Sequence, residues 1–156
     1  MIIVSACLCG INCKYNGSNN LDARVFKLFK EGKAMPVCPE QLGGLETPRE
    51  PREIVNGNGI DVLEGRAKIL GAQQNDDVTS KFLKGAYETL KITEIVGAKI
   101  AILKAGSPSC GVSLIYDGTF SGTKKKGNGV TAQLLLSRGI KVFTEENLDE
   151  LELYIE

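Results

Sequence analysis

The chain of 156 residues contains no histidine. This absence excludes a Ser-His-Asp triad, a Cys-His dyad, a Cys₂His₂ zinc site and an imidazole general base. Acid–base catalysis would have to use Glu, Asp, Lys, Tyr or Cys. Metal binding would have to rest on thiolates, with carboxylates as the other available ligands.

The sequence also lacks an excess of charge of either sign, since 19 Lys and Arg residues balance 19 Asp and Glu residues. A net charge of zero argues against a polymeric nucleic acid or a membrane surface as partner. No apolar run approaches the length of a transmembrane helix, and Asn12 and Lys14 follow the start too soon for a signal peptide. We therefore expect a cytoplasmic protein, and its length predicts one domain over residues 1–156.

Cysteine is present in an odd number, five, at positions 7, 9, 13, 38 and 110. An odd number in a cytoplasmic chain makes a disulfide framework improbable and favours metal binding or catalysis. Three of these thiols lie within the stretch Ser5–Cys13, directly after the apolar run Ile2–Val4. This pattern predicts a buried strand that delivers the thiols to a loop, where Gly10 permits a sharp turn.

The rest of the chain alternates between strand and helix patterns, which predicts right-handed parallel βαβ units. We expect an α/β fold that is Rossmann-like and three-layered, with a mainly parallel sheet of about four strands. A small antiparallel hairpin insertion is expected near residues 54–70, because Asn-Gly and Glu-Gly pairs divide its apolar runs. The expected strands are 2–4, 34–38, 99–104 and 140–143; the expected helices are 20–31, 76–96, 130–137 and one capped by Thr144; the expected loops are 45–53 and 114–128.

The cysteines recur just beyond the predicted strands. Cys7, Cys38 and Cys110 each follow a strand, and Cys13 lies in the first of these loops. If the strands are parallel, all four thiols reach the same edge of the sheet, where α/β proteins bind ligands. Such thiols suit an iron–sulfur cluster or zinc, although the Cys-x-x-Cys pairs typical of structural zinc are absent. Each of them taken singly is also compatible with an ordinary buried cysteine.

The chain carries a set of short motifs around its cysteines and loops: Ser5–Leu8, Cys13–Gly17, Cys38–Glu40 with Gly43–Leu45, Thr47–Arg49, Ser107–Gly111 and Tyr116–Gly122. In combination these motifs resemble the thiouracil desulfurase family, also called thiouracil desulfidases, which are small bacterial iron–sulfur proteins. The resemblance covers nearly the whole chain and implies a [4Fe–4S] cluster that is held by Cys7, Cys13 and Cys110, with one iron lacking a protein ligand. It also implies catalytic roles for Glu40 and Ser107.

The activity implied by the resemblance is removal of sulfur from a thiolated pyrimidine, such as 2-thiouracil, with release of sulfide. A soft thione sulfur should bind an open iron, which would polarise the C–S bond. The expected partner is a small thiolated base or nucleotide, and the expected state is a monomer or small homo-oligomer. Two alternatives stay open: a cluster-free thiol or persulfide enzyme that uses Cys38 or Cys110, and a zinc or iron–sulfur binding module without catalysis.

The roles of four further features stay open at this point. Cys9 stands where the family usually has leucine; it is either a substitute ligand or a small apolar replacement, and we favour the latter. Arg49 either belongs to a proline turn or anchors an anionic group. The run Lys124–Lys126 is most simply a solvated loop tip. Cys38 is expected near the cluster without being one of its ligands.

Overall fold

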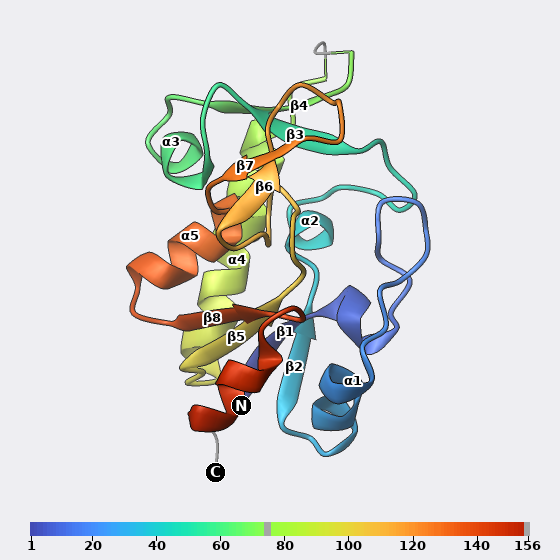
Figure 1. Cartoon of the computed structure of the whole chain (residues 1–156), viewed down its shortest axis with the longest axis vertical. Helices are drawn as coiled ribbons and strands as arrows, with labels where there is room; N and C mark the ends of the chain where they lie inside the picture. Colours follow the sequence, from blue (N-terminus) through green and yellow to red (C-terminus); the bar gives the residue numbers. More distant parts are fainter. Residues whose placement is uncertain (74–75, 155–156) are drawn as a thin grey trace.

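The computed structural model describes residues 1–73 and 76–154. Its centre is a parallel sheet of four strands in the order β2-β1-β5-β8 (Figure 1). Consecutive residues of β1 point to opposite faces and are all buried, as expected for a parallel sheet that is covered on both sides. The strands of this sheet are β1 (Ile2–Ser5), β2 (Ala34–Val37), β5 (Ile100–Leu103) and β8 (Lys141–Thr144).

The two faces of the sheet bury separate hydrophobic clusters. Ile3 of β1 packs in a large cluster with α4 (Thr79–Ile95) and α5 (Val130–Ser137). Its neighbours Ile2 and Val4 pack in a second cluster with α1 (Ala23–Lys30) and the 3₁₀ helix η2 (Leu148–Leu153). The result is a three-layer α/β fold, so the predicted fold class is confirmed.

The strand order contains a topological switch point. From β1 the chain passes through α1 to β2 on one side, whereas from β5 it continues to β8 on the other side. Loops that leave β1 and β5 therefore diverge and open a crevice at the carboxyl ends of these strands, which is the usual ligand position in open α/β sheets.

The predicted insertion near residues 54–70 is antiparallel, as expected, but it is not a simple hairpin. β3 (Arg52–Val55) pairs with β4 (Lys68–Gly71), and the short helix α3 (Gly59–Leu63) lies between them. The Asp61 carboxylate accepts a hydrogen bond from the backbone N–H of Asn58 at 2.9 Å, which begins the helix. The Asn-Gly repeat therefore leads into a helix rather than a tight turn, and β3 begins inside the predicted polar loop 45–53.

Other boundaries also differ from the sequence prediction. α4 begins at Thr79 rather than near Asp76, because Asp77 accepts hydrogen bonds from the backbone N–H and hydroxyl of Thr79 in a preceding turn. Thr144 ends β8 instead of capping a helix, and η2 follows it as a 3₁₀ helix. The loose hairpin predicted in 114–128 is present as β6 (Leu114–Tyr116) and β7 (Lys124–Lys126).

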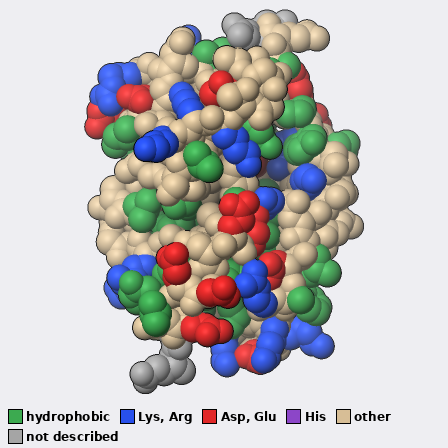
Figure 2. Space-filling model, viewed as in Figure 1, with side chains coloured by type: hydrophobic (Ala, Val, Ile, Leu, Met, Phe, Trp, Pro, Cys, Tyr) green, Lys and Arg blue, Asp and Glu red, His purple; other side chains and the backbone are tan. Residues whose placement is uncertain are grey.

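The distribution of charge and the character of the helices agree with the balanced charge and the short apolar runs of the sequence. On the face shown in Figure 2, basic and acidic side chains are interspersed. Within the described part of the chain, no helix combines the length and apolar character needed to cross a membrane.

The short helix α2 (Pro39–Leu42) was not predicted, and it packs against α4 through glycine. Pro39 occupies the first turn of α2, a position that its missing N–H tolerates. A Cβ atom added to Gly85 of α4 would lie 1.8 Å from the carbonyl oxygen of Pro39, and one added to Gly43 would lie 1.9 Å from that of Lys81. The two backbones therefore touch, and this contact sets the position of α2.

Gly85→Ala should consequently destabilise the protein although alanine favours a helix by about 1 kcal/mol over glycine. Because the added methyl group would overlap backbone atoms on α2, we expect a loss of roughly 1–3 kcal/mol in the free energy of unfolding. Urea unfolding measures this change. Lys84→Ala, at the exposed neighbouring position, is the control and should shift stability by less than about 0.5 kcal/mol. A stabilising Gly85→Ala would contradict the close contact.

Candidate active site

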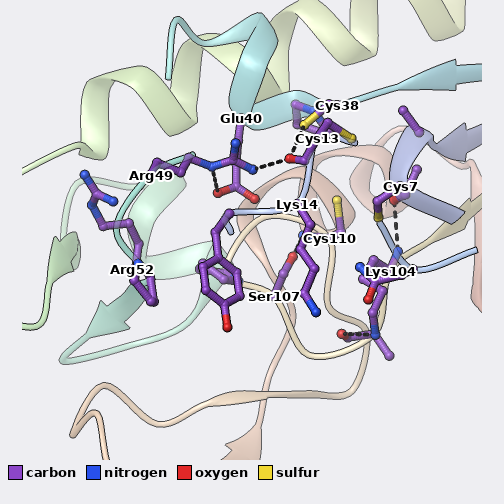
Figure 3. Close-up of a pocket in the computed structure, with 18 of the residues that line it drawn as sticks. Cys7, Cys13, Lys14, Cys38, Glu40, Arg49, Arg52, Lys104, Ser107 and Cys110 are labelled. Atoms are coloured by element: carbon purple, nitrogen blue, oxygen red, sulfur yellow. Dashed lines mark hydrogen bonds and ion pairs between the residues drawn. The ribbon is translucent and has the colours of Figure 1, made fainter. Parts of the chain in front are cut away.

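Four of the five cysteines line one crevice at the switch point of the sheet (Figure 3). Its volume is about 420 Å³. Cys7 comes from the 3₁₀ helix η1 (Ala6–Cys9) after β1, Cys13 from the loop beyond it, Cys38 from the start of α2 and Cys110 from the loop after β5. The structure thus brings together the thiols that the strand-exit pattern placed at one edge.

Local backbone geometry explains how the first loop presents two thiols to the crevice. Gly10 ends η1 with φ of 85°, a left-handed conformation that glycine adopts without strain. The N–H of Cys13 donates to the carbonyl oxygen of Ile11 at 2.8 Å, so the chain turns back immediately after the glycine. Cys13 is buried with 2% of its surface exposed.

The thiols interact with one another. A hydrogen bond with the Cys13 thiol lowers the pKa of Cys7 and also lowers the pKa of Cys38, to about 7. Hydrogen bonds to Cys38 and Cys7 in turn raise the pKa of Cys13. Burial raises the pKa of Cys110 to about 12, which makes it a poor nucleophile on its own.

Cys9 lies apart from the other thiols. It is buried in the hydrophobic cluster that also contains Val25 and Leu8, and it does not line the crevice. Burial raises its pKa to about 11. These features agree with its interpretation as a small apolar residue.

Glu40 occupies the first turn of α2 and lines the crevice beside Arg49. Its Oε1 atom accepts a hydrogen bond from Nε of Arg49 at 3.3 Å, and Figure 3 shows the two side chains side by side. Burial raises the pKa of Glu40, and the charge of Arg49 opposes this rise without cancelling it. The carboxyl group is thus suited to hold a proton closer to neutral pH than an exposed glutamate does.

Ser107 lines the same crevice from the loop after β5. Its Oγ atom accepts a hydrogen bond from the backbone N–H of Cys110 at 2.7 Å. Because this oxygen already acts as an acceptor there, its own O–H group is free to donate into the crevice.

The structure adds crevice residues that sequence reasoning did not identify. Arg52 is held by Asp76 at 2.5 Å, and Lys104 is held by Glu145 at 2.6 Å. Glu53 accepts hydrogen bonds from the N–H groups of Gly118 and Phe120, and it thereby fixes the loop that carries the Tyr116–Gly122 motif. For Arg52 and Glu53, the only hint in the sequence was the high density of charged residues in 46–53. A polar surface loop accounts for that density equally well.

The thiols that line the crevice are donors of the kind that iron–sulfur clusters use. Among the residues described, no three cysteine or carboxylate side chains converge as the ligands of one metal ion. The thiols of Cys7, Cys13 and Cys110 instead border a cavity, and all belong to the soft ligand class that iron–sulfur clusters use. These three residues could hold such a cluster, while their assignment as its ligands stays a prediction.

The fold and the thiol-lined crevice agree with comparisons to known proteins. The family model for 2-thiouracil desulfurase matches residues 2–147, so the chain belongs to the 2-thiouracil desulfurase family. It is 50% identical over 151 residues to the uncharacterized protein YbbK of Bacillus subtilis, an alignment that covers 97% of this chain and 99% of YbbK. It also resembles the solved structure of the [4Fe–4S]-dependent thiouracil desulfidase TudS, with a TM-score of 0.85 and 40% identity over 97% of this chain and 95% of that one.

The raised pKa of Glu40 predicts a pH dependence of stability in the metal-free protein. A carboxyl whose pKa is higher in the folded than in the unfolded chain binds more protons when folded. The free energy of unfolding must then fall as the pH rises from the unfolded value of 4.5 through the raised value. Glu40→Gln cannot ionise and should lose this fall, so its stability relative to the parent should increase as the pH rises above about 4.5. Urea titrations across this range provide the measurement, and parallel curves for both proteins would contradict the raised pKa.

Proposed function

We propose that this protein removes sulfur from a thiolated pyrimidine with a [4Fe–4S] cluster bound by Cys7, Cys13 and Cys110. The observation that carries the proposal is the convergence of these thiols with Glu40 and Ser107 on one crevice. Membership of the 2-thiouracil desulfurase family and the similarity to TudS support it.

The reaction that fits these residues is hydrolytic: a thione and water give an oxo base and hydrogen sulfide, with no net transfer of electrons. When bound, the cluster would supply a soft Lewis acid for the thione sulfur through an iron that no protein residue ligates. The protein must bind the base, direct a water molecule and move protons. In a chain without histidine, Glu40 is the crevice carboxyl best suited to the last task.

Glu40 is placed to orient water and accept its proton at a carboxylate oxygen. Arg49 holds Oε1, which restricts the rotation of the carboxyl group and leaves Oε2 as the oxygen without this contact. Because burial raises the pKa of Glu40, the proton that it accepts can be returned to the leaving sulfur at moderate pH. One residue can therefore serve as base and then as acid.

Ser107 is placed to orient the substrate rather than to transfer protons. Its hydroxyl oxygen is fixed by the N–H of Cys110, so its O–H can donate to a nitrogen or oxygen atom of the pyrimidine. The same hydrogen bond ties Ser107 to a predicted cluster ligand. Substrate orientation and cluster position are thereby coupled through the loop after β5.

The cluster assignment predicts the metal content of protein that is purified without oxygen. We expect about four irons and four sulfides per chain. Ser replacement of Cys7, Cys13 or Cys110 should abolish both the visible absorbance and desulfuration, since a hydroxyl is a poor ligand for the soft iron site. Cys9→Ser is the control and should retain the cluster. Stoichiometric zinc, or desulfuration by metal-free protein, would contradict the assignment.

The role of Glu40 predicts a selective loss of turnover. Glu40→Gln preserves the size of the side chain but cannot take a proton, so kcat should fall by about two to four orders of magnitude with the cluster intact. Ser107→Ala should cost less, because it removes one hydrogen bond and no proton transfer. Anaerobic assays with 2-thiouracil, 4-thiouracil and thiouridine monophosphates would measure both effects. Full activity of Glu40→Gln with an intact cluster would remove Glu40 from the mechanism.

A further inference from the structure

Arg49 is the most fully engaged side chain of the crevice. Only 4% of the side chain is exposed. Nε donates to Oε1 of Glu40 at 3.3 Å, and Nη2 donates to the carbonyl oxygen of Cys13 at 2.8 Å. Nη1 donates to the Thr47 hydroxyl at 2.8 Å and to the Glu46 carbonyl oxygen at 3.2 Å. All three guanidinium nitrogens are therefore used within the protein, and the sequence-based possibility that Arg49 anchors an anionic ligand loses support.

The same residue is attached to the first cysteine loop through its backbone. The N–H of Arg49 donates to the carbonyl oxygen of Tyr15 at 2.6 Å. With the bond from Nη2 to Cys13, residue 49 thus holds the Cys13–Tyr15 segment at two points. Figure 3 shows the dashed contacts from Arg49 to Glu40 and to Cys13. The guanidinium of Arg49 therefore joins the first cysteine loop, at Cys13, to helix α2, at Glu40.

We propose that Arg49 is a positioning residue that holds Cys13 and Glu40 in a fixed relation to each other. The inference rests on the proposed function for the roles of these two residues, but the contacts themselves belong to the protein alone. A guanidinium can direct several N–H groups to separate oxygens in one plane, whereas an ammonium is a compact charge that cannot span the same acceptors. Arg49→Lys should therefore keep the positive charge and lose the geometry.

The first test measures the Cys13 segment without any cluster. Metal-free parent and Arg49→Lys proteins are treated with iodoacetamide, and alkylation of each cysteine is followed by mass spectrometry. Loss of a hydrogen bond from a charged donor predicts an increase of about tenfold in the alkylation rate of Cys13. Cys9 is the internal reference, because it is buried in the hydrophobic cluster of Val25 and Leu8 and does not line the crevice that Arg49 lines. Its rate should stay unchanged.

Two further variants distinguish the effect of the Arg49 hydrogen bonds from the effect of other hydrogen bonds nearby. Gln41→Ala removes the hydrogen bond from the Gln41 amide to Thr47 Oγ1, which is 2.8 Å long, and leaves the contacts of Arg49 in place. It should leave the Cys13 rate unchanged. Thr47→Val removes the acceptor that orients Nη1 and should raise the Cys13 rate by roughly threefold, as expected for one neutral acceptor. This variant decides the question if Arg49→Lys does not fold.

The second test measures the relation to Glu40 with cluster-loaded enzyme. Arg49→Lys should lower kcat by about tenfold with little change in KM, because it displaces a group that acts on the bound substrate. In a Glu40→Gln background, with kcat expressed per bound cluster so that any loss through Cys13 is accounted for, the same substitution should lower kcat no further, since the catalytic group that it positions is already inactive. A merely structural role would lower kcat equally in both backgrounds.

The outcomes distinguish this inference from the proposed function. An unchanged Cys13 rate in Arg49→Lys, or a parallel rise at Cys13 and Cys9, would overturn the positioning of Cys13, and equal losses of kcat per cluster in both backgrounds would overturn the positioning of Glu40. A parent protein without iron or without desulfuration would instead overturn the proposed function. The alkylation measurements would then still decide whether Arg49 holds the Cys13 segment.

Discussion

The parallel pairing of β1 with β5 is the constraint on which the rest of the site depends. Ile3 pairs with Ala101 and Val4 with Ile102, so both strands end at the same level. The hydroxyl of Ser5 accepts a hydrogen bond from the N–H of Lys104 at 2.9 Å, which extends the alignment beyond the last paired residues. Because of this alignment, the loops that carry Cys7 and Cys110 leave the sheet together and face one crevice.

Burial of charge is the second organising feature of the crevice. Glu40, Arg49 and Lys104 all line the cavity, and each forms an ion pair within the protein. Glu40 pairs with Arg49, and Lys104 pairs with Glu145. Ion pairs that are largely removed from water are costly to break because one unpartnered charge remains. The polar side chains are therefore held in fixed positions, which is what proton transfer at a defined atom requires.

The sequence predicted the sheet and the meeting of the thiols because both depend on short-range patterns. Apolar runs such as Ile2–Val4 identify strands, and parallel strands place their exits at one edge. It did not predict α2 or the contacts of Arg49. The packing of α2 depends on Gly43 and Gly85, which are 42 positions apart in the printed sequence and carry no local signal for contact. Arg49 likewise donates to the carbonyl oxygen of Cys13. Every residue type has a main-chain carbonyl group, so the sequence cannot indicate which one serves as the acceptor.

The thiols of the crevice also have a consequence for how the chain holds together. Cys7 belongs to the first strand exit and Cys110 to the third, so the segment between them includes α1, β2, the β3–β4 insertion and α4. A prosthetic group bound at both positions would close a loop of roughly 100 residues and act as a cross-link, which restricts the unfolded chain more than the folded one. Binding of the cofactor would then stabilise the folded chain, and unfolding of the chain would release the cofactor.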